Sequence, residues 1–83
     1  MAGKPKSLSK SGHRQVKNLG KRIKELRKKS GYTSYDTLAH EHSIVRSQYG
    51  KYEQGVDMKF STILKLAEIH GLTLKEFFAE GFE

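Results

Sequence analysis

The sequence predicts a small all-α domain built from five helices. Apolar residues recur at three- and four-residue steps in several segments, which is the period of a helix buried on one side. Segments with glycine and small polar residues separate these stretches, and the strand-like alternation of apolar and polar residues is missing along the sequence. The short connections favour a compact bundle. A chain of 83 residues makes one domain with a small core.

The first segment of the chain, residues 1–14, is basic and carries almost no apolar side chains after Met1. Because such a segment buries little surface on folding, we expect a flexible N-terminal arm there. The folded domain then spans residues 15–83. The segment lacks the apolar stretch of a secretory signal, and no run in the sequence is long enough to cross a membrane. A cytoplasmic protein is the simplest interpretation.

A first helix is expected between the arm and Gly31. Its apolar stripe consists of Val16, Leu19, Ile23 and Leu26. Gly31 predicts the end of the helix, because the residue after a C-cap often has a positive φ angle, which glycine adopts easily. Lysines in the last turn suit the negative end of the helix dipole.

Two short helices are expected next, over residues 34–42 and 46–54. Thr33 and Asp36 have the spacing of a capping box, in which a hydroxyl and an acid accept hydrogen bonds from backbone N–H groups at the start of a helix. The small Ala39 lies near the expected crossing of the two helices and allows them to approach closely. This is the geometry of a helix-turn-helix, whose second helix enters the major groove of DNA.

A fourth and a fifth helix complete the bundle. The apolar residues expected to point inward from the fourth helix are Phe60, Ile63, Leu64 and Ala67. Gly71 predicts its end. Thr73 and Glu76 repeat the spacing of a capping box, which predicts a last short helix directly after them.

Positive charge is concentrated in the first part of the sequence. Residues 1–30 carry eleven Lys or Arg against one acid, whereas residues 31–83 carry five bases and eight acids. An asymmetry of this size favours a polyanionic partner, with nucleic acid first among the candidates. A basic tail that only aids solubility explains the same charge, so charge alone leaves both interpretations open.

The segment 46–54 has two different sides on a helical wheel. Tyr49 and Tyr52 fall on one side. The opposite arc contains Arg46, Ser47, Gly50, Lys51 and Gln54. Arginine, lysine, glutamine and serine are residues that hydrogen-bond base edges and phosphates in a major groove. We therefore expect the tyrosines to face the core and the opposite arc to face DNA, with a merely solvated polar face as the alternative.

Gly50 is an unusual residue for the interior of this helix. Glycine there costs about 0.5–1 kcal/mol relative to alanine. Because Gly50 falls between Arg46 and Gln54 on the polar arc, we expect its missing side chain to let the helix sit close to the DNA. A chance substitution at a tolerant surface position is the alternative.

Several motifs together resemble the phage-repressor/Cro-type helix-turn-helix family, also called Xre-like. They are "LGKRIKELRKKSGYT", the pair Leu38-Ala39, "RSQYGKYEQG" and "ILKLAEIHGLTLKEFF". "GYTSYD" with "RSQYGKYEQG" is also similar to a tyrosine-rich subgroup of bacterial regulators. The resemblance implies a lambda-repressor-like bundle that binds a specific double-stranded DNA sequence. It further implies a homodimer, usually on a palindromic operator, and a role in transcriptional control.

The resemblance also implies roles for single residues. Base-reading or near-base contacts fall on Arg46, Ser47, Gln48 and Lys51. Phosphate contacts fall on Ser34, Gln54 and Lys59, and the basic first helix adds Lys17 and Lys21. Arg27 matches a family arginine that pairs with the acid at Glu53, which would link the first and third helices.

Two departures from the family pattern concern the turn between the second and third helices. Ser43 stands where glycine is usual, which predicts a strained positive φ angle. Val45 stands at the N-cap of the third helix, where Ser, Thr or Asn is usual. The loss of such a cap costs about 1 kcal/mol.

Catalytic and metal sites are not predicted. His40, Glu41 and His42 come closest to a metal motif, but residues two apart on a helix point in different directions. The sequence contains no nucleophile–base pattern, phosphate loop or paired-carboxylate motif, and it has no cysteine to supply a thiolate. We expect neither enzyme activity nor a cofactor.

Three phenylalanines, Phe77, Phe78 and Phe82, lie near the C-terminal end. One or two of them are expected to complete the core over the first helix, and the remainder to form a symmetric dimer contact. An antitoxin-like or partner-docking module of the same fold is the alternative function. Nonspecific nucleic-acid binding through the basic arm alone is a third possibility.

Overall fold

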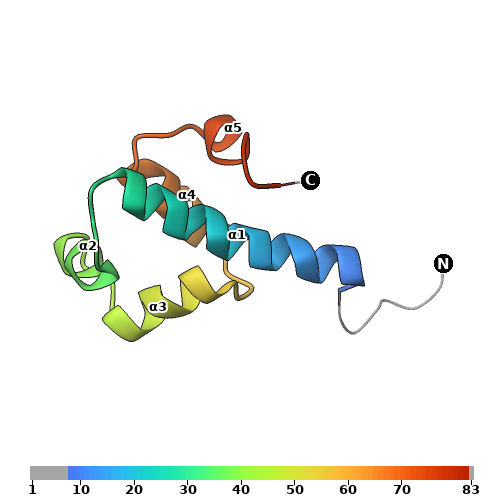
Figure 1. The fold of residues 1–83 in the computed structure, drawn as a ribbon, viewed down its shortest axis with the longest axis horizontal. Helices are drawn as coiled ribbons and strands as arrows, with labels where there is room; N and C mark the ends of the chain where they lie inside the picture. The colour runs from blue at the N-terminus through green and yellow to red at the C-terminus, as the bar shows by residue number, and fades with distance from the viewer. Residues whose placement is uncertain (1–7, 83) are drawn as a thin grey trace.

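A computed structural model describes residues 8–82 of the protein. It consists of α1 (Lys10–Lys29), α2 (Tyr35–Glu41), α3 (Arg46–Gln54), α4 (Phe60–Ile69) and α5 (Leu74–Phe77). Within residues 8–82 there is no strand, so the prediction of an all-α fold with five helices is confirmed. Helix α1 crosses the middle of the molecule, with α2 and α3 on one side and α5 on the other (Figure 1).

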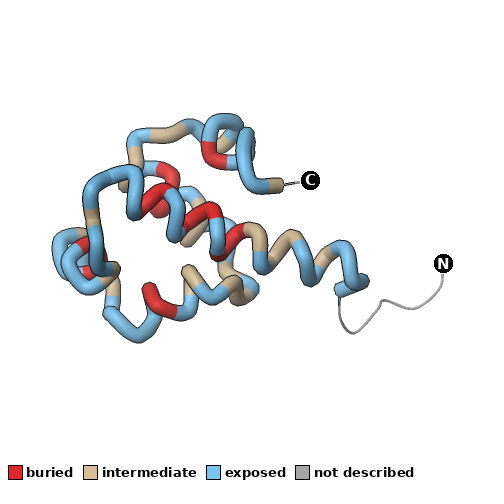
Figure 2. The backbone as a smooth tube through the Cα atoms, viewed as in Figure 1, coloured by how far each residue is buried: buried red, intermediate tan, exposed pale blue. Residues whose placement is uncertain are grey.

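The first helix begins earlier than its apolar stripe. Ser9 is the N-cap, and its hydroxyl accepts a hydrogen bond from the Gly12 N–H at 3.1 Å. Residues 10–14 are therefore helical, and the prediction of a flexible arm is wrong for this part; residues 1–7 lie outside the described residues. None of residues 10–18 is buried, so the first half of α1 extends beyond the core (Figure 2).

The end of α1 follows the prediction, whereas the start of α2 differs by one residue. Gly31 follows the C-cap of α1 with a φ angle of 90°. The N-cap of α2 is Ser34, whose hydroxyl accepts a hydrogen bond from the Asp36 N–H at 3.2 Å. The predicted capping box from Thr33 is therefore wrong, because the neighbouring hydroxyl occupies the capping position.

The turn between α2 and α3 has both predicted departures. Ser43 has a φ angle of 56°, in the left-handed region that is costly for a residue with a Cβ atom. Val45 is the N-cap of α3 and makes no side-chain capping hydrogen bond. Its side chain is 70% exposed, so α3 begins without the usual polar cap.

The fourth helix is rotated relative to the prediction. Leu66 and Ala67 are buried, whereas Phe60 and Leu64 are 57% and 39% exposed. The expectation that Phe60 and Leu64 point inward is therefore wrong. Ile63 also packs against the core. The inward residues of α4 are therefore Ile63, Leu66 and Ala67, which follow the steps i, i+3 and i+4 of one helix face.

The last helix has the predicted start. The Thr73 hydroxyl accepts a hydrogen bond from the Glu76 N–H at 3.1 Å, and the Glu76 carboxylate accepts one from the Thr73 N–H at 2.9 Å. This is a complete capping box. It directs Phe77, which is fully buried, into the core.

The core lies where the second half of α1 meets the other four helices (Figure 2). Its buried apolar residues are Leu19, Ile23, Leu26, Leu38, Ala39, Tyr49, Leu66, Ala67 and Phe77. Nine residues make a small core, so the polar contacts that hold the helices together also matter for the position of α3.

Candidate nucleic-acid interface

The C-terminal end of α3 lies directly against the backbone of α1. A Cβ atom on Gly20 would lie 2.5 Å from the Gly55 nitrogen and 2.7 Å from the Glu53 carbonyl oxygen. Gly55 is the C-cap of α3 with a φ angle of 86°, which favours glycine. Two glycines thus allow the backbones of α1 and α3 to touch. Sequence reasoning missed Gly20, although a glycine within a strongly periodic helix is a signal for such a crossing.

A buried ion pair joins the same two helices. The Arg27 Nε donates to Glu53 Oε2 at 2.6 Å, and Nη2 donates to Oε1 at 3.1 Å. The two side chains are only 6% and 8% exposed. The hydrogen bond to Glu53 raises the pKa of Arg27 above its ordinary value. The third nitrogen, Nη1, donates to the Tyr32 carbonyl oxygen at 2.9 Å, so the pair expected from the resemblance also ties down the α1–α2 turn.

The tyrosines of α3 face inward, as predicted. Tyr49 is fully buried and Tyr52 is half-buried. Tyr49 packs against the rings of Tyr52 and Tyr35, with centroids 6.0 and 5.9 Å away. Burial raises the pKa of the Tyr49 hydroxyl, so this side chain acts as a neutral core residue.

Gly50 is buried, and the prediction that it lies on the exposed arc close to DNA is wrong. A Cβ atom there would lie 3.2 Å from the Tyr35 hydroxyl oxygen. Tyr35 belongs to helix α2, which therefore covers this part of α3. As a result, the buried sector of α3 extends around the helical wheel from Tyr49 to Gly50. The missing side chain makes room for Tyr35 of α2.

The exposed side of α3 consists of polar residues without an acid. Ser47, Lys51 and Gln54 are exposed and lie along one face at steps of four and three residues. Gln48 is also exposed, one position around the helix from Ser47. The acid of this helix, Glu53, is turned inward by its pair with Arg27.

Arg46 starts α3 and is held by residues of α2. Its Nε donates to Asp36 Oδ1 at 2.5 Å, although both side chains are mainly exposed. Its Cζ lies 5.9 Å from the centroid of the Tyr35 ring, a cation–π distance. The hydrogen bond to Asp36 raises the pKa of Arg46 above its ordinary value. Sequence reasoning placed Arg46 on the exposed side but missed both of its partners.

A family model described as a helix-turn-helix domain matches residues 20–80, most of the chain. The chain belongs to the helix-turn-helix domain family. Membership indicates a DNA-binding regulator, and domains of this family are typically not enzymes. Comparison with curated proteins gave no significant match, and neither did comparison with solved structures.

The basic residues on α1 of this helix-turn-helix domain include two groups with different surroundings. Arg22 and Arg27 are buried at 4% and 5% exposure. Arg22 donates from Nε to the Phe77 carbonyl oxygen at 2.8 Å and from Nη2 to the Glu76 carbonyl oxygen at 3.0 Å. These arginines bind the ends of other helices, so they do not contribute to a DNA surface.

Four exposed lysines of α1 form the second group. They follow steps of three and four residues on the side away from the core: Lys17, Lys21, Lys24 and Lys28. The backbone of Lys17 lies beside Gly55, since a Cβ on that glycine would be 2.9 Å from the Lys17 Cα. Lys17 therefore flanks the C-terminal end of α3, and Lys21 lies one turn further along α1.

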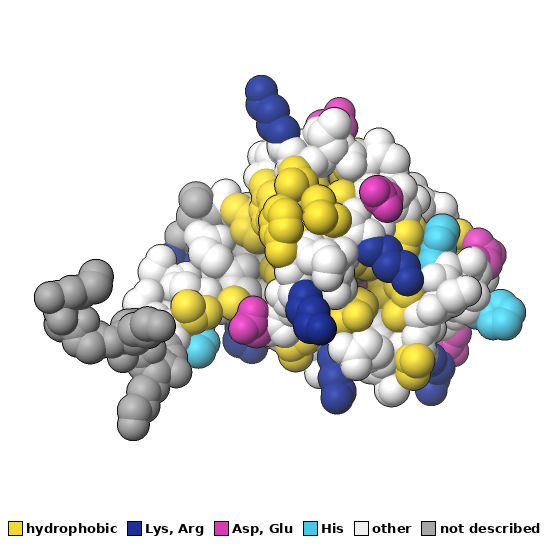
Figure 3. Space-filling view, turned by 180° about the vertical axis from the view of Figure 1, so that it is seen from behind, with side chains coloured by type: hydrophobic (Ala, Val, Ile, Leu, Met, Phe, Trp, Pro, Cys, Tyr) yellow, Lys and Arg dark blue, Asp and Glu magenta, His cyan; other side chains and the backbone are white. Residues whose placement is uncertain are grey.

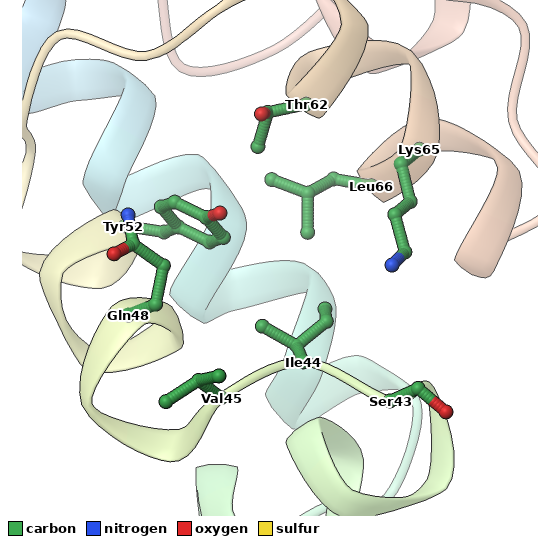
Figure 4. A pocket seen from close by; sticks show the side chains of 8 residues that line it. All are labelled: Ser43, Ile44, Val45, Gln48, Tyr52, Thr62, Lys65 and Leu66. Carbon is green, nitrogen blue, oxygen red and sulfur yellow. The ribbon is translucent and has the colours of Figure 1, made fainter.

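The residues expected at the edges of the interface are also exposed. Ser34 caps α2, and Lys59 is the N-cap of α4 without a side-chain capping bond. Between α3 and α4 lies a hollow of about 260 Å³. Figure 4 shows that it is lined by the turn before α3, by Gln48 and Tyr52 of α3, and by Thr62, Lys65 and Leu66 of α4.

The hollow contains no carboxylate or imidazole among its lining residues. In residues 8–82, no group of three or more His, Cys, Asp or Glu side chains is placed to hold a metal ion. His40, Glu41 and His42 are therefore not brought together as ligands with a further residue. Over the same part of the chain, no helix combines the length and apolar character that a membrane crossing needs.

The three phenylalanines at the C-terminal end have different environments. Phe77 is fully buried and is therefore the phenylalanine that completes the core; the capping box of α5 points it inward, which leaves Phe78 and Phe82 for the expected dimer contact. Phe78 is 40% exposed, and its ring centroid lies 5.0 Å from that of Phe82. These two rings line a shallow apolar depression with Gln15, Val16 and Leu19 of α1. Hydrophobic side chains also gather in one patch in the upper half of the view from behind (Figure 3).

Proposed function

We propose that this helix-turn-helix domain is a transcriptional regulator of the Cro/CI, or Xre-like, type that binds a specific double-stranded DNA sequence. Helix α3 enters the major groove, and Arg46, Ser47, Gln48 and Lys51 contact bases. One observation carries the proposal: the exposed side of α3 offers only hydrogen-bonding side chains and positive charge, while its acid is buried in a pair with α1.

The phosphate contacts surround α3 in this proposal. Gln54 is the last residue of α3 and Lys59 lies beyond it, Ser34 lies at the start of α2, and Lys17 and Lys21 lie on α1. The basic N-terminal segment, residues 1–14, adds further phosphate contacts. In a plot of the logarithm of the binding constant against the logarithm of the salt concentration, each neutralised phosphate contributes about −0.9 to the slope. Affinity therefore falls steeply as the salt concentration rises.

A homodimer on a palindromic operator completes the proposal. Phe78 and Phe82, with the depression beside Val16 and Leu19, form the contact between the two copies. A partly exposed pair of aromatic rings is costly in water and typical of the centre of an interface. The site of action is the bacterial cytoplasm, at the nucleoid.

Selection from a random duplex library at two salt concentrations tests the function. We expect enrichment of a palindromic consensus, whose half-site spacing reports the dimer geometry. Arg46→Ala is then expected to lose about 1–3 kcal/mol of discrimination at one base position. Equal losses on the operator and on random DNA would remove Arg46 from the base readers. No enrichment at either salt concentration would favour a partner-docking protein module instead.

A further inference from the structure

We infer that Asp36 and Tyr35 of α2 are positioning residues that orient Arg46 to read a guanine. The inference rests on the proposed function and identifies one base of the DNA site. Its starting point is the hydrogen bond from Arg46 Nε to Asp36 Oδ1 at 2.5 Å. The guanidinium is thus fixed at one nitrogen, while the side chain as a whole remains 70% exposed.

The base follows from the nitrogens that remain available. Within residues 8–82, neither Nη1 nor Nη2 of Arg46 makes a hydrogen bond. These two atoms form the end of the guanidinium fork and donate two roughly parallel hydrogen bonds. Guanine is the base that presents two acceptors, O6 and N7, on its major-groove edge. An arginine held at Nε therefore suits a guanine.

Tyr35 supplies the second restraint on Arg46. Its ring centroid lies 5.9 Å from the Arg46 Cζ. The ring is itself held by the core, because it packs against the buried Tyr49 at 5.9 Å and occupies the space that Gly50 leaves open. The orientation of Arg46 is thus connected to the buried contact between α2 and α3, and this gives Gly50 its role.

These contacts affect affinity and selectivity in opposite directions. Holding the long arginine side chain before binding reduces the entropy that it loses on the DNA, which favours the base contact. A carboxylate close to DNA phosphates repels them, which weakens binding to every sequence. Asp36 therefore lowers affinity for random DNA and raises the preference for guanine. An acid that only stabilised the fold would not raise the preference for guanine while lowering the affinity for random DNA.

The test is Asp36→Asn in the full chain, measured by dissociation constants at one salt concentration. The probes are the selected duplex, the same duplex with its Arg46-dependent base pair replaced, and a random duplex. We expect the variant to bind random DNA several-fold more tightly and to lose roughly five- to tenfold of the guanine preference. Gly50→Ala, which displaces Tyr35, is expected to lower the preference while leaving affinity for random DNA unchanged.

Asp57→Asn is the matched control, because it removes the same charge from an exposed position beyond α3. It is expected to tighten binding to random DNA with no change in preference. If Asp36→Asn kept or increased the preference for guanine, the inference would be overturned. Asp36 would then only compete with the DNA for the Arg46 side chain. If the wild-type protein selects a site without a guanine that depends on Arg46, the inference fails while the proposed function stands. If it selects no sequence, both fail.

Discussion

Helix α3 is held at each end by an arginine–carboxylate pair, and the two pairs have very different surroundings. At its C-terminal end, Glu53 pairs with Arg27 in the interior, with side chains 8% and 6% exposed. At its N-terminal end, Arg46 pairs with Asp36 at the surface, with side chains 70% and 52% exposed. The buried pair sets the position of the helix on α1, whereas the surface pair sets the direction of one side chain. Burial, and not the chemistry of the pair, decides between these roles.

The backbone of α3 is also more firmly held at its C-terminal end than at its N-terminal end. The C-terminal end is capped by Gly55 and touches α1 at Gly20. The N-terminal end begins at Val45, which provides no side-chain cap. The backbone of the helix is therefore fixed against α1 at its C-terminal end, whereas three of its four proposed base readers, Arg46, Ser47 and Gln48, lie in the first turn.

The largest expected effect comes from breaking the buried pair. Glu53→Ala leaves the Arg27 guanidinium buried without its bidentate partner, which costs about 3–5 kcal/mol of the free energy of unfolding. Chemical denaturation followed by circular dichroism measures this loss. In a domain of this size it is a large part of the total stability.

Two further variants sharpen the comparison between the pairs. The double variant Arg27→Met with Glu53→Leu is expected to recover most of the loss, since neither buried charge remains. Asp36→Ala, at the exposed pair, is expected to leave the midpoint of unfolding unchanged. If Asp36→Ala destabilised the fold as much as Glu53→Ala, the assignment of different roles would be wrong.

The next largest effect is expected from Gly20→Ala. The new Cβ would lie 2.5 Å from the Gly55 nitrogen, so the backbones of α1 and α3 must separate. We expect a net loss of about 1–3 kcal/mol, despite the better helix propensity of alanine. Gly12→Ala is the comparison in the same helix, because its Cβ would meet Leu8 at 2.9 Å, and Leu8 lies before the N-cap and is 51% exposed, so it can move away without separating two helices. Equal stability of the wild type and Gly20→Ala in denaturation would contradict the close crossing.

A smaller effect is expected from Gly50→Ala. The added Cβ would lie 3.2 Å from the Tyr35 hydroxyl oxygen, at the far end of a side chain that can move by a few tenths of an ångström. The strain offsets the helix-propensity gain of about 0.5–1 kcal/mol, so the free energy of unfolding should change by less than about 1 kcal/mol. A loss as large as that of Gly20→Ala would mean that the Tyr35 ring is fixed as firmly as the α1–α3 crossing.

The smallest expected effect is a pH dependence that involves neither pair. His70 is half-buried at the C-cap of α4, with Nδ1 2.9 Å from the Ser30 hydroxyl. Burial lowers its pKa below the ordinary value of 6.5, and the charges of His42 and Arg22 lower it further. The unfolded chain therefore binds the proton more readily. This contribution to stability is complete above pH 6.5 and decreases as the pH falls through the lowered pKa.

Urea denaturation at about pH 7.5 and about pH 5.5 measures this contribution. The midpoint of the wild type is expected to fall more between the two pH values than that of His70→Gln. The same decrease in both proteins would assign the pH dependence to groups other than His70. The two arginine–carboxylate pairs are left intact in this comparison.

Local patterns in the sequence determined much of the helical framework. The steps of three and four apolar residues, Gly31, and the spacing of Thr73 and Glu76 predicted five helices and most of their ends. The inward direction of Tyr49 and Tyr52 also followed from helical periodicity. These features depend on residues within one or two turns of each other, so the sequence alone contains the necessary information.

Only some of the contacts that α3 makes with other helices could be predicted from the sequence. The Arg27–Glu53 pair was expected from the resemblance to a family, because no local pattern connects residues that far apart. Neither the Asp36–Arg46 pair nor the crossing at Gly20 was predicted. Both are contacts between helices, which depend on how the helices are oriented.

The tertiary structure alone decided which part of each helix is covered. Gly50 lies on the polar arc of the wheel, yet α2 buries it, and Phe60 lies on an apolar stripe, yet it is exposed. A helical wheel shows which residues share a direction, but the position and angle of the neighbouring helix decide which direction is buried. The sequence therefore determined a helix-turn-helix with a polar, basic third helix. Its packing decided that Gly50 accommodates Tyr35 and that Arg46 is held by Asp36.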